Sequence, residues 1–485
     1  MRQKLFISLF IAVLTCLGAC SKIPHYTNTD KVLAVFPNYA GATIPLNIAP
    51  LNFYIEDSNS EKHLVRLVAG KDSFDVKCGQ KVNIPQRKWK KLLKNHAGET
   101  LNIRLFSKIG NDWMKHPDLT LQIAAEPIDP YLVYRLIEPG YEFWGEMGIY
   151  QRNLENFTET PILINTLMDG NCMNCHSFSR NNPEKMLFHL RVQHGGTLFI
   201  NEGEISKINT KTPNAISAAV YPRWHPDGRF VAFSVNKTSQ VFHSSHENLV
   251  EVYDSASDLI IYDTKTNTLT TPPRIQSSSR LETYPEWSPD GKTLYFCSAR
   301  TLKMPDHYSS LKYDLFSVDF NPETGEIGAV VDTIFKASDI GKSVAFPRIS
   351  SDGKNIMLCL SDFGTFPIWH KENDLYLLNL ETREISNLLE VNSDESDSYH
   401  SWSSNGRWFV FSSRRLDGLY TRPYIAYFDS SGKAHTPFLL PQKDPLFYRD
   451  FIKSYNVPEL VTGKVKQNIR TIERAAKKPP KAVRN

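Results

Sequence analysis

Apolar and polar residues alternate in short runs between residues 39 and 128, which is typical of strands that bury one face. The exception is the segment 86–96, where Trp89, Leu92 and Leu93 fall on one side of a helix. Short strands separated by turn residues indicate a small β-sandwich domain over residues 39–128. Its clearest expected strands are 51–55, 64–68, 101–105 and 119–123.

A longer pattern repeats four times in the second half of the chain. Each copy contains a strand, an Asp-Gly or Asn-Gly turn and an apolar strand, followed by a third strand. Such a turn closes a β-hairpin because glycine readily adopts the positive φ that the turn needs. Hairpins repeated at a long period predict the blades of a β-propeller. The turn glycines are Gly228, Gly291, Gly353 and Gly406, which lie 63, 62 and 53 residues apart.

The motif Trp-Ser-Pro-Asp-Gly-Lys at residues 287–292, with an apolar strand behind it, resembles the WD40-like (PD40) repeats of TolB-type propellers. The resemblance covers residues 218–440 and implies a six-bladed propeller, but it implies nothing about chemistry. Two degenerate blades, one including residues 148–154, are needed before the four clear copies. We therefore expect an all-β chain in which a six-bladed TolB-like propeller over residues 129–442 follows the sandwich. Residues 443–485 are expected to form a short helix and a disordered, basic tail.

Residues 171–177 contain the most chemically specific motif of the chain, Cys-x-x-Cys-His. Cys172 and Cys175 supply two thiols and His176 an imidazole, which is the attachment signature of a c-type haem. We expect the thiols about one helical turn apart, so that both can bond one edge of the macrocycle. With 7 Cys and 14 His in 485 residues, a chance match has a probability of about 0.003. The sequence therefore predicts haem c as the cofactor.

Two other interpretations of the motif are a thioredoxin-type redox pair and half of a zinc site. A redox pair does not need His176, and the sequence contains no second Cys-x-x-Cys to complete a zinc ribbon. Cys297 and Cys359 occupy equivalent strand positions in different repeats, so we expect them to be buried free thiols and not a disulfide.

His176 is expected to be the proximal iron ligand, and the sixth position decides what the haem can do. The candidate distal ligands are His189, His400, Met186 and, as a further local alternative, His194. His400 occupies in the last repeat the alignment position of His176. For each candidate, the alternative is a polar strand residue that is hydrogen-bonded to backbone. Aligning Cys175 with the aromatic residue of the repeat places the motif on the inner strand of the second blade, near one mouth of the channel.

The N-terminus is predicted to export and anchor the protein. A short positive segment precedes an apolar run at residues 5–14 that is too short to span a bilayer as a helix. The following Leu-Gly-Ala-Cys resembles a bacterial lipobox, which implies removal of residues 1–19 and acylation of Cys20. The alternative is ordinary secretory cleavage before the same cysteine. We expect a lipid anchor in the bacterial outer membrane, a periplasm-facing protein, and a linker over residues 20–38.

Charge is divided unevenly along the mature chain. From residue 461 onward eight Lys and Arg residues accompany a single acid, so the tail carries +7 while residues 20–460 carry −5. A mildly acidic body argues against nucleic acid as the main partner. The tail can contact anionic lipid or a protein, although a solvated tail is the more common outcome for such a run.

These features leave three classes of function. The first is an anchored electron-transfer or redox-partner protein, whose partners are haem, membrane lipid and a protein that docks or exchanges electrons. The second is a TolB-like binding scaffold with a structural or sensory haem. The third is a haem enzyme with an open iron site, for which Arg414 and Arg415 are the only acid–base candidates near His400. A stand-alone enzyme is the least expected of the three.

Overall fold

The computed structural model of the chain describes residues 25–484, except residues 58, 61, 139–144, 214 and 274 and the side chain of Cys175. The predicted signal peptide and the predicted lipidation site, Cys20, lie outside the described residues. Among the helices that are described, none is long and apolar enough to cross a membrane.

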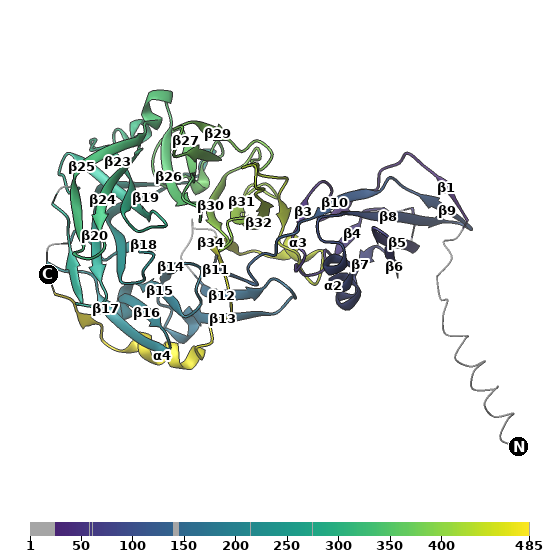
Figure 1. The fold of residues 1–485 in the computed structure, drawn as a ribbon, viewed down its shortest axis with the longest axis horizontal. Helices are drawn as coiled ribbons and strands as arrows, with labels where there is room; N and C mark the ends of the chain where they lie inside the picture. Colours follow the sequence, from purple (N-terminus) through teal and green to yellow (C-terminus); the bar gives the residue numbers. More distant parts are fainter. Residues whose placement is uncertain are drawn as a thin grey trace, which may run out of the picture.

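The N-terminal region contains two sheets and one helix, and it lies beside a ring of further sheets (Figure 1). The four strands expected here are present as β4, β5, β8 and β10, and the expected helix is α2 (Gln86–Asn95), which buries Trp89, Leu92 and Leu93. One sheet contains β1 (Tyr26–Asn28), β3 (Thr43–Ile44), β5 (Lys62–Ala69), β6 (Asp72–Cys78), β8 (Thr100–Ile109), β9 (Asp112–Lys115) and β10 (Leu119–Ile123). The other contains β2 (Val35–Phe36), β4 (Phe53–Ile55) and β7 (Lys81–Val82).

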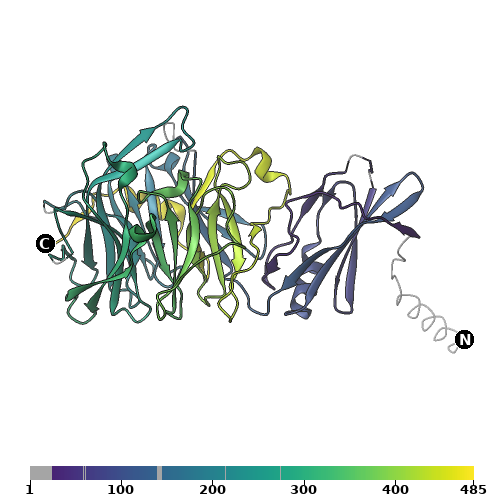
Figure 2. The same ribbon diagram turned by 90° about the horizontal axis from the view of Figure 1, so that it is seen from above.

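Six further sheets of four or five strands follow in the described part of the chain, and we number them 1 to 6. Sheet 1 contains β13 (Glu159–Ile164), β12 (Gly148–Asn153), β11 (Tyr131–Ile137) and β34 (Ser454–Val461). Sheet 2 contains β14 (Met173–Phe178), β15 (Lys185–Leu190), β16 (Gly196–Asn201), β17 (Glu204–Asn209) and β35 (Lys481–Ala482). Sheet 3 contains β18 (Val220–Trp224), β19 (Phe230–Phe242), β20 (Val250–Asp263) and β21 (Thr268–Thr270). Sheet 4 contains β22 (Arg280–Trp287), β23 (Thr293–Arg300), β24 (Asp314–Asn321) and β25 (Glu326–Phe335); sheet 5 contains β26 (Ser343–Ile349), β27 (Asn355–Ser361), β28 (Asp374–Asn379) and β29 (Ile385–Asn387); sheet 6 contains β30 (Asp397–Trp402), β31 (Trp408–Ser413), β32 (Arg422–Tyr427) and β33 (Phe438–Leu439). The chain is thus mostly β-sheet with few helices, and the ring is propeller-like (Figures 1 and 2).

The inner strands of the ring share one irregularity, a β-bulge that adds a residue to the strand. The bulge residue has a positive φ of 49° or 50° in five sheets, at Tyr221, Tyr284, Phe346, Tyr399 and Val457. The first four of these rings contact one another in sequence, with centroid separations of 4.5, 4.5 and 4.7 Å, and we call them the aromatic collar. By register, the bulge position of sheet 2 belongs to Cys175, which confirms its alignment with the aromatic residue of the repeat.

The residue after the bulge is proline in four sheets and histidine in two. The prolines are Pro222, Pro285, Pro347 and Pro458. The histidines are His176 in sheet 2 and His400 in sheet 6, so the predicted equivalence of these two positions is confirmed.

The C-terminal segment departs from the expectation of a helix and a disordered tail. The expected helix is the short α3 (Phe447–Asp450), but β34 then enters the ring as the inner strand of sheet 1, beside β11. Helix α4 (Ile469–Lys477) buries Ile472 and Ala476, and β35 pairs with β17 of sheet 2. The reason is that β11, β12 and β13 alone leave sheet 1 without an inner strand, and the C-terminal segment supplies it.

Candidate functional site

The Cys-x-x-Cys-His motif lies on an extended strand and not on a helix, contrary to the expected one-turn spacing. Its residues enter β14, the inner strand of sheet 2, which pairs with β15 and is bulged between Asn174 and Ser177. The strand forms because its backbone completes the ladder of sheet 2, as the equivalent strands do in the other sheets. Cys172, Asn174 and His176 all line the same cavity.

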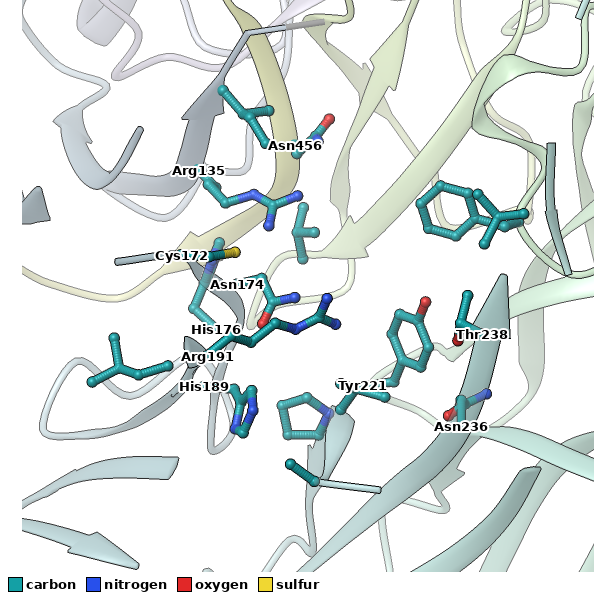
Figure 3. Close-up of a pocket in the computed structure, with 18 of the residues that line it drawn as sticks. Arg135, Cys172, Asn174, His176, His189, Arg191, Tyr221, Asn236, Thr238 and Asn456 are labelled. Atoms are coloured by element: carbon teal, nitrogen blue, oxygen red, sulfur yellow. The ribbon is translucent and has the colours of Figure 1, made fainter. Parts of the chain in front are cut away.

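The cavity measures about 1510 Å³ and lies among sheets 1, 2, 3, 5 and 6, at one mouth of the ring. Pockets for small ligands usually measure roughly 300–1,000 Å³, so this one has room for a large ligand. Of the predicted ligands, His176 and His189 line it together with Cys172 (Figure 3). His400 also lines it. Met186 does not line it, because its side chain is fully buried in the apolar core of sheet 2.

His176 is buried without a hydrogen-bond partner. His176 is only 3% exposed, and neither Nδ1 nor Nε2 makes a well-formed hydrogen bond with a described residue, although the Val133 and Val457 backbone lies near the ring. Burial, and after it the nearby Arg135 and Arg223, lower the pKa of His176 to about 3. The imidazole is therefore neutral at any ordinary pH, and it retains a lone pair that nothing described occupies.

His189 has one engaged and one open ring nitrogen. It pairs with Asn174 across β14 and β15, and its Nδ1 lies 3.2 Å from the Thr197 hydroxyl oxygen. No described residue bonds its Nε2. Burial, followed by the charge of Arg191, lowers the pKa of His189 to about 3. A histidine whose second nitrogen is fixed by a neighbour is the usual form of a metal ligand.

The remaining predicted residues are engaged elsewhere. Nε2 of His400 is 2.9 Å from the Met357 carbonyl, and its Nδ1 is 3.9 Å from Sγ of Cys359. Nε2 of His194 lies 2.9 Å from an Asp169 carboxylate oxygen. Arg414 donates to the Ile368 carbonyl at 2.7 Å, and Arg415 pairs with Asp397 at 2.9 Å. These contacts therefore occupy the side chains that we predicted as possible iron ligands or acid–base groups.

Cys297 and Cys359 are buried free thiols in the structure. This confirms the expectation from their positions in the repeat.

A band of charges along the wall of the cavity was not foreseen from the sequence. It occupies the position two residues after the bulge, where Arg223 pairs with Glu286 at 3.0 Å and Glu286 also faces Arg348 at 3.5 Å. Glu459 accepts a hydrogen bond from the Phe178 backbone at 3.1 Å. Burial raises the pKa of both glutamates to about 7, although Arg223 opposes the shift. Aligning the four repeats column by column would have shown Arg223, Glu286 and Arg348 together.

The described residues can be compared with the needs of a protein-built metal centre and with those of a haem. No group of three or more His, Cys, Asp or Glu side chains in the described part of the chain could hold a metal ion. A haem needs only one or two axial side chains from the protein, because the porphyrin supplies the other ligands. The unpartnered ring of His176, the open Nε2 of His189 and the adjoining Cys172 meet that need within one cavity.

No family model and no curated protein sequence matches this chain. Solved structures align with parts of the chain at low sequence identity. An oligogalacturonate lyase in complex with manganese covers 63% of this chain and 72% of its own, at 13% identity and a TM-score of 0.36. A Mycobacterium tuberculosis puromycin-hydrolyzing peptidase covers 83% of this chain and 57% of its own, at 13% identity and a TM-score of 0.37. The periplasmic gluconolactonase PpgL of Pseudomonas aeruginosa covers 64% of this chain and 97% of its own, at 10% identity and a TM-score of 0.33. All three TM-scores are below 0.5, so these similarities establish neither the fold nor the chemistry of this chain.

Proposed function

We propose that the chain is a six-bladed TolB-like propeller preceded by a small β-sandwich. Sheets 1 to 6 supply the blades, and the shared bulge and turn positions support a common repeat. The C-terminal β34 closes the ring by lying in sheet 1 beside the first strand of the ring. In the N-terminal region, the separate sheets β1-β9-β8-β10-β3 and β2-β4-β7 support the sandwich.

We further propose that the protein is an exported, lipid-anchored c-type haem protein that transfers electrons. The observation that carries this proposal is His176, a buried imidazole that follows Cys-x-x-Cys and makes no well-formed hydrogen bond with a described residue. A buried polar group without a hydrogen bond costs about 1–3 kcal/mol, so such a group points to an additional ligand. Four of the six equivalent positions hold proline, so histidine is not required by the bulge.

In this proposal each residue of the site has a defined role. The thiols of Cys172 and Cys175 would bond the porphyrin, which requires both thiols to reach the same cavity. His176 supplies the proximal lone pair, and His189 Nε2 supplies the distal one, while Thr197 fixes the other nitrogen of His189. When bound, the haem supplies a one-electron carrier whose potential depends on these axial ligands.

Electron transfer is favoured over catalysis because of how the cavity side chains are engaged. Two imidazoles on one iron leave no position for a substrate, and a low-spin centre of that kind carries electrons. Arg414 and Arg415, the acid–base candidates, are bonded to backbone and to Asp397. A protein redox partner then becomes necessary, because a single haem exchanges one electron at a time.

The axial ligands can be tested by spectroscopy on protein from a host with cytochrome c maturation. We expect a low-spin spectrum in both redox states and no binding of carbon monoxide. Rapid carbon monoxide binding with a high-spin spectrum would contradict the electron-transfer proposal. The sensory or enzymatic class would then be favoured.

The membrane anchor is tested separately. Cys20→Ser should give a soluble exported protein or an uncleaved precursor, because the acylated thiol is lost. Unchanged, lipid-modified membrane association of this variant would contradict the lipobox.

A further inference from the structure

Arg135 is a cation that faces the cavity without an anionic partner. Its side chain extends from β11 into the cavity, near Cys172 and Asn174 (Figure 3). Its Nε is buried and unbonded, and its Nη1 makes only a long contact of 3.4 Å with the Met173 carbonyl. None of the described carboxylates lies within ion-pair distance of it.

The carboxylates that line the same cavity are used by other groups. Glu138 accepts a hydrogen bond from the Gly145 backbone at 3.1 Å. Glu459 accepts from the Phe178 backbone at 3.1 Å. No described carboxylate therefore balances the charge of Arg135, which lies half-buried at the wall of the cavity.

A second guanidinium faces the same part of the cavity. Arg191 follows β15 and is held by Asn174, whose amide oxygen, when turned toward it, accepts from Nη2 at 3.0 Å and from Nε at 3.3 Å. Arg191 likewise has no ion pair with a described carboxylate. Guanidinium groups bind carboxylates through two parallel hydrogen bonds, which is the geometry that a ligand carboxylate offers.

We propose that Arg135 and Arg191 form a carboxylate-binding site beside His176. Two sources can supply the carboxylate: a propionate of the bound haem, or a separate small carboxylic acid. The first source rests on the proposed haem function, whereas the second does not. In either case Arg135 is a positioning residue that holds the ligand and adds positive charge near the iron.

The expected effect on the haem has a definite sign. Positive charge near the iron disfavours the oxidised, more positive form, so removing it favours oxidation. Arg135→Gln should therefore change the oxidised-to-reduced ratio at a fixed potential by about tenfold, which equals a downward shift of 59 mV for one electron. Arg135→Lys should restore much of the potential, because it keeps the charge but loses the planar fork.

The experiment compares the wild type, Arg135→Gln, Arg135→Lys and Arg348→Gln. Arg348 is the matched control, because it lines the same cavity but already faces Glu286. Haem content is measured first by the mass of the denatured protein, the midpoint potential by titration, and propionate hydrogen bonding by resonance Raman spectroscopy. Acetate binding is measured by calorimetry on the same proteins.

A lowered potential and a shifted propionate band in Arg135→Gln, but not in Arg348→Gln, support the site with haem as the source. Acetate binding that weakens at least tenfold in Arg135→Gln supports it with a soluble source. If the protein contains no haem, the proposed function fails while the acetate measurement still tests the site. Unchanged potential, Raman band and acetate binding overturn the proposal.

Discussion

His176 and His400 occupy the same position in sheets 2 and 6, and their residues are 3% and 2% exposed, but their bonding differs completely. The imidazole of His400 is hydrogen-bonded to the Met357 carbonyl and contacts Cys359, so it links sheet 6 to sheet 5. His176 bonds nothing that the structure describes. Position and burial are thus equal, and only the partners distinguish a histidine that stabilises the ring from one that is free to bind a ligand.

The first way to test this difference is to replace His176 with the residue that four other sheets carry. His176→Pro should keep the bulge and the fold but remove the proximal ligand, so that the haem spectrum changes entirely. Circular dichroism checks the fold, and the optical spectrum checks the iron. If the spectrum of this variant matched the wild type, His176 would not be a ligand.

The second test concerns the distal position. His189→Ala should leave the haem attached and convert the low-spin spectrum to high-spin, with carbon monoxide now able to bind. The cause is the loss of the Nε2 that no described residue bonds. Thr197→Val is the matched control, because it removes only the hydroxyl next to Nδ1 and should leave the iron low-spin. A low-spin His189→Ala variant would exclude His189 and favour His400.

A third histidine, His370, is buried in the charged state and extends the comparison to pH. Its Nε2 lies 2.9 Å from Glu251, which crosses from sheet 3. Burial alone would lower the pKa of His370, but Glu251 and Glu372 outweigh it and raise the pKa to about 9. The contacts of charged His370 with Glu251 and Glu372 stabilise the folded state by about 3 kcal/mol. This stabilisation is complete below pH ~6.5 and is lost as pH rises through about 9.

Urea unfolding at several pH values measures this loss. The wild type should lose stability between pH 6.5 and 9.5 relative to His370→Gln, which has no such titration. Parallel pH profiles for the two proteins would contradict the assignment of a charged His370.

The smallest expected effect belongs to His400→Pro. The bulge tolerates proline at this position, but the Met357 carbonyl loses its donor. We expect a destabilisation of about 1–2 kcal/mol and an unchanged haem spectrum. A spectral change comparable to that of His189→Ala would reverse the roles of the two histidines.

The sequence predicted the repeat units well because turn glycines and apolar strands are local signals. The tight turns at Gly228, Gly291, Gly353 and Gly406 all have positive φ, as expected. The equivalence of His176 and His400 followed from the same alignment. What the repeats could not show was the closure of the ring by β34, because its pairing with β11 joins residues more than three hundred positions apart.

The structure brings three of the predicted site residues, Cys172, His176 and His189, to one cavity, but the local structure of the motif differs from the prediction. The motif suggested a helical turn, whereas the ladder of sheet 2 holds it on a bulged strand. The preference for His189 over His400 depends on the Thr197 hydroxyl beside His189 and on the Met357 carbonyl that accepts a hydrogen bond from His400, and only the folded chain reveals these contacts. Arg135 and Arg191 carried no sequence signal, because a cation without a partner is recognised only when its surroundings are known.

The central claim is that Cys172 and Cys175 hold a haem covalently beside His176. The most direct measurement is the intact mass of the denatured protein, isolated from a host with cytochrome c maturation. The wild type should carry the added mass of one haem, and a double Cys172→Ser, Cys175→Ser variant should carry none. A wild-type mass equal to that of the polypeptide alone, with all haem released on denaturation, would contradict the claim.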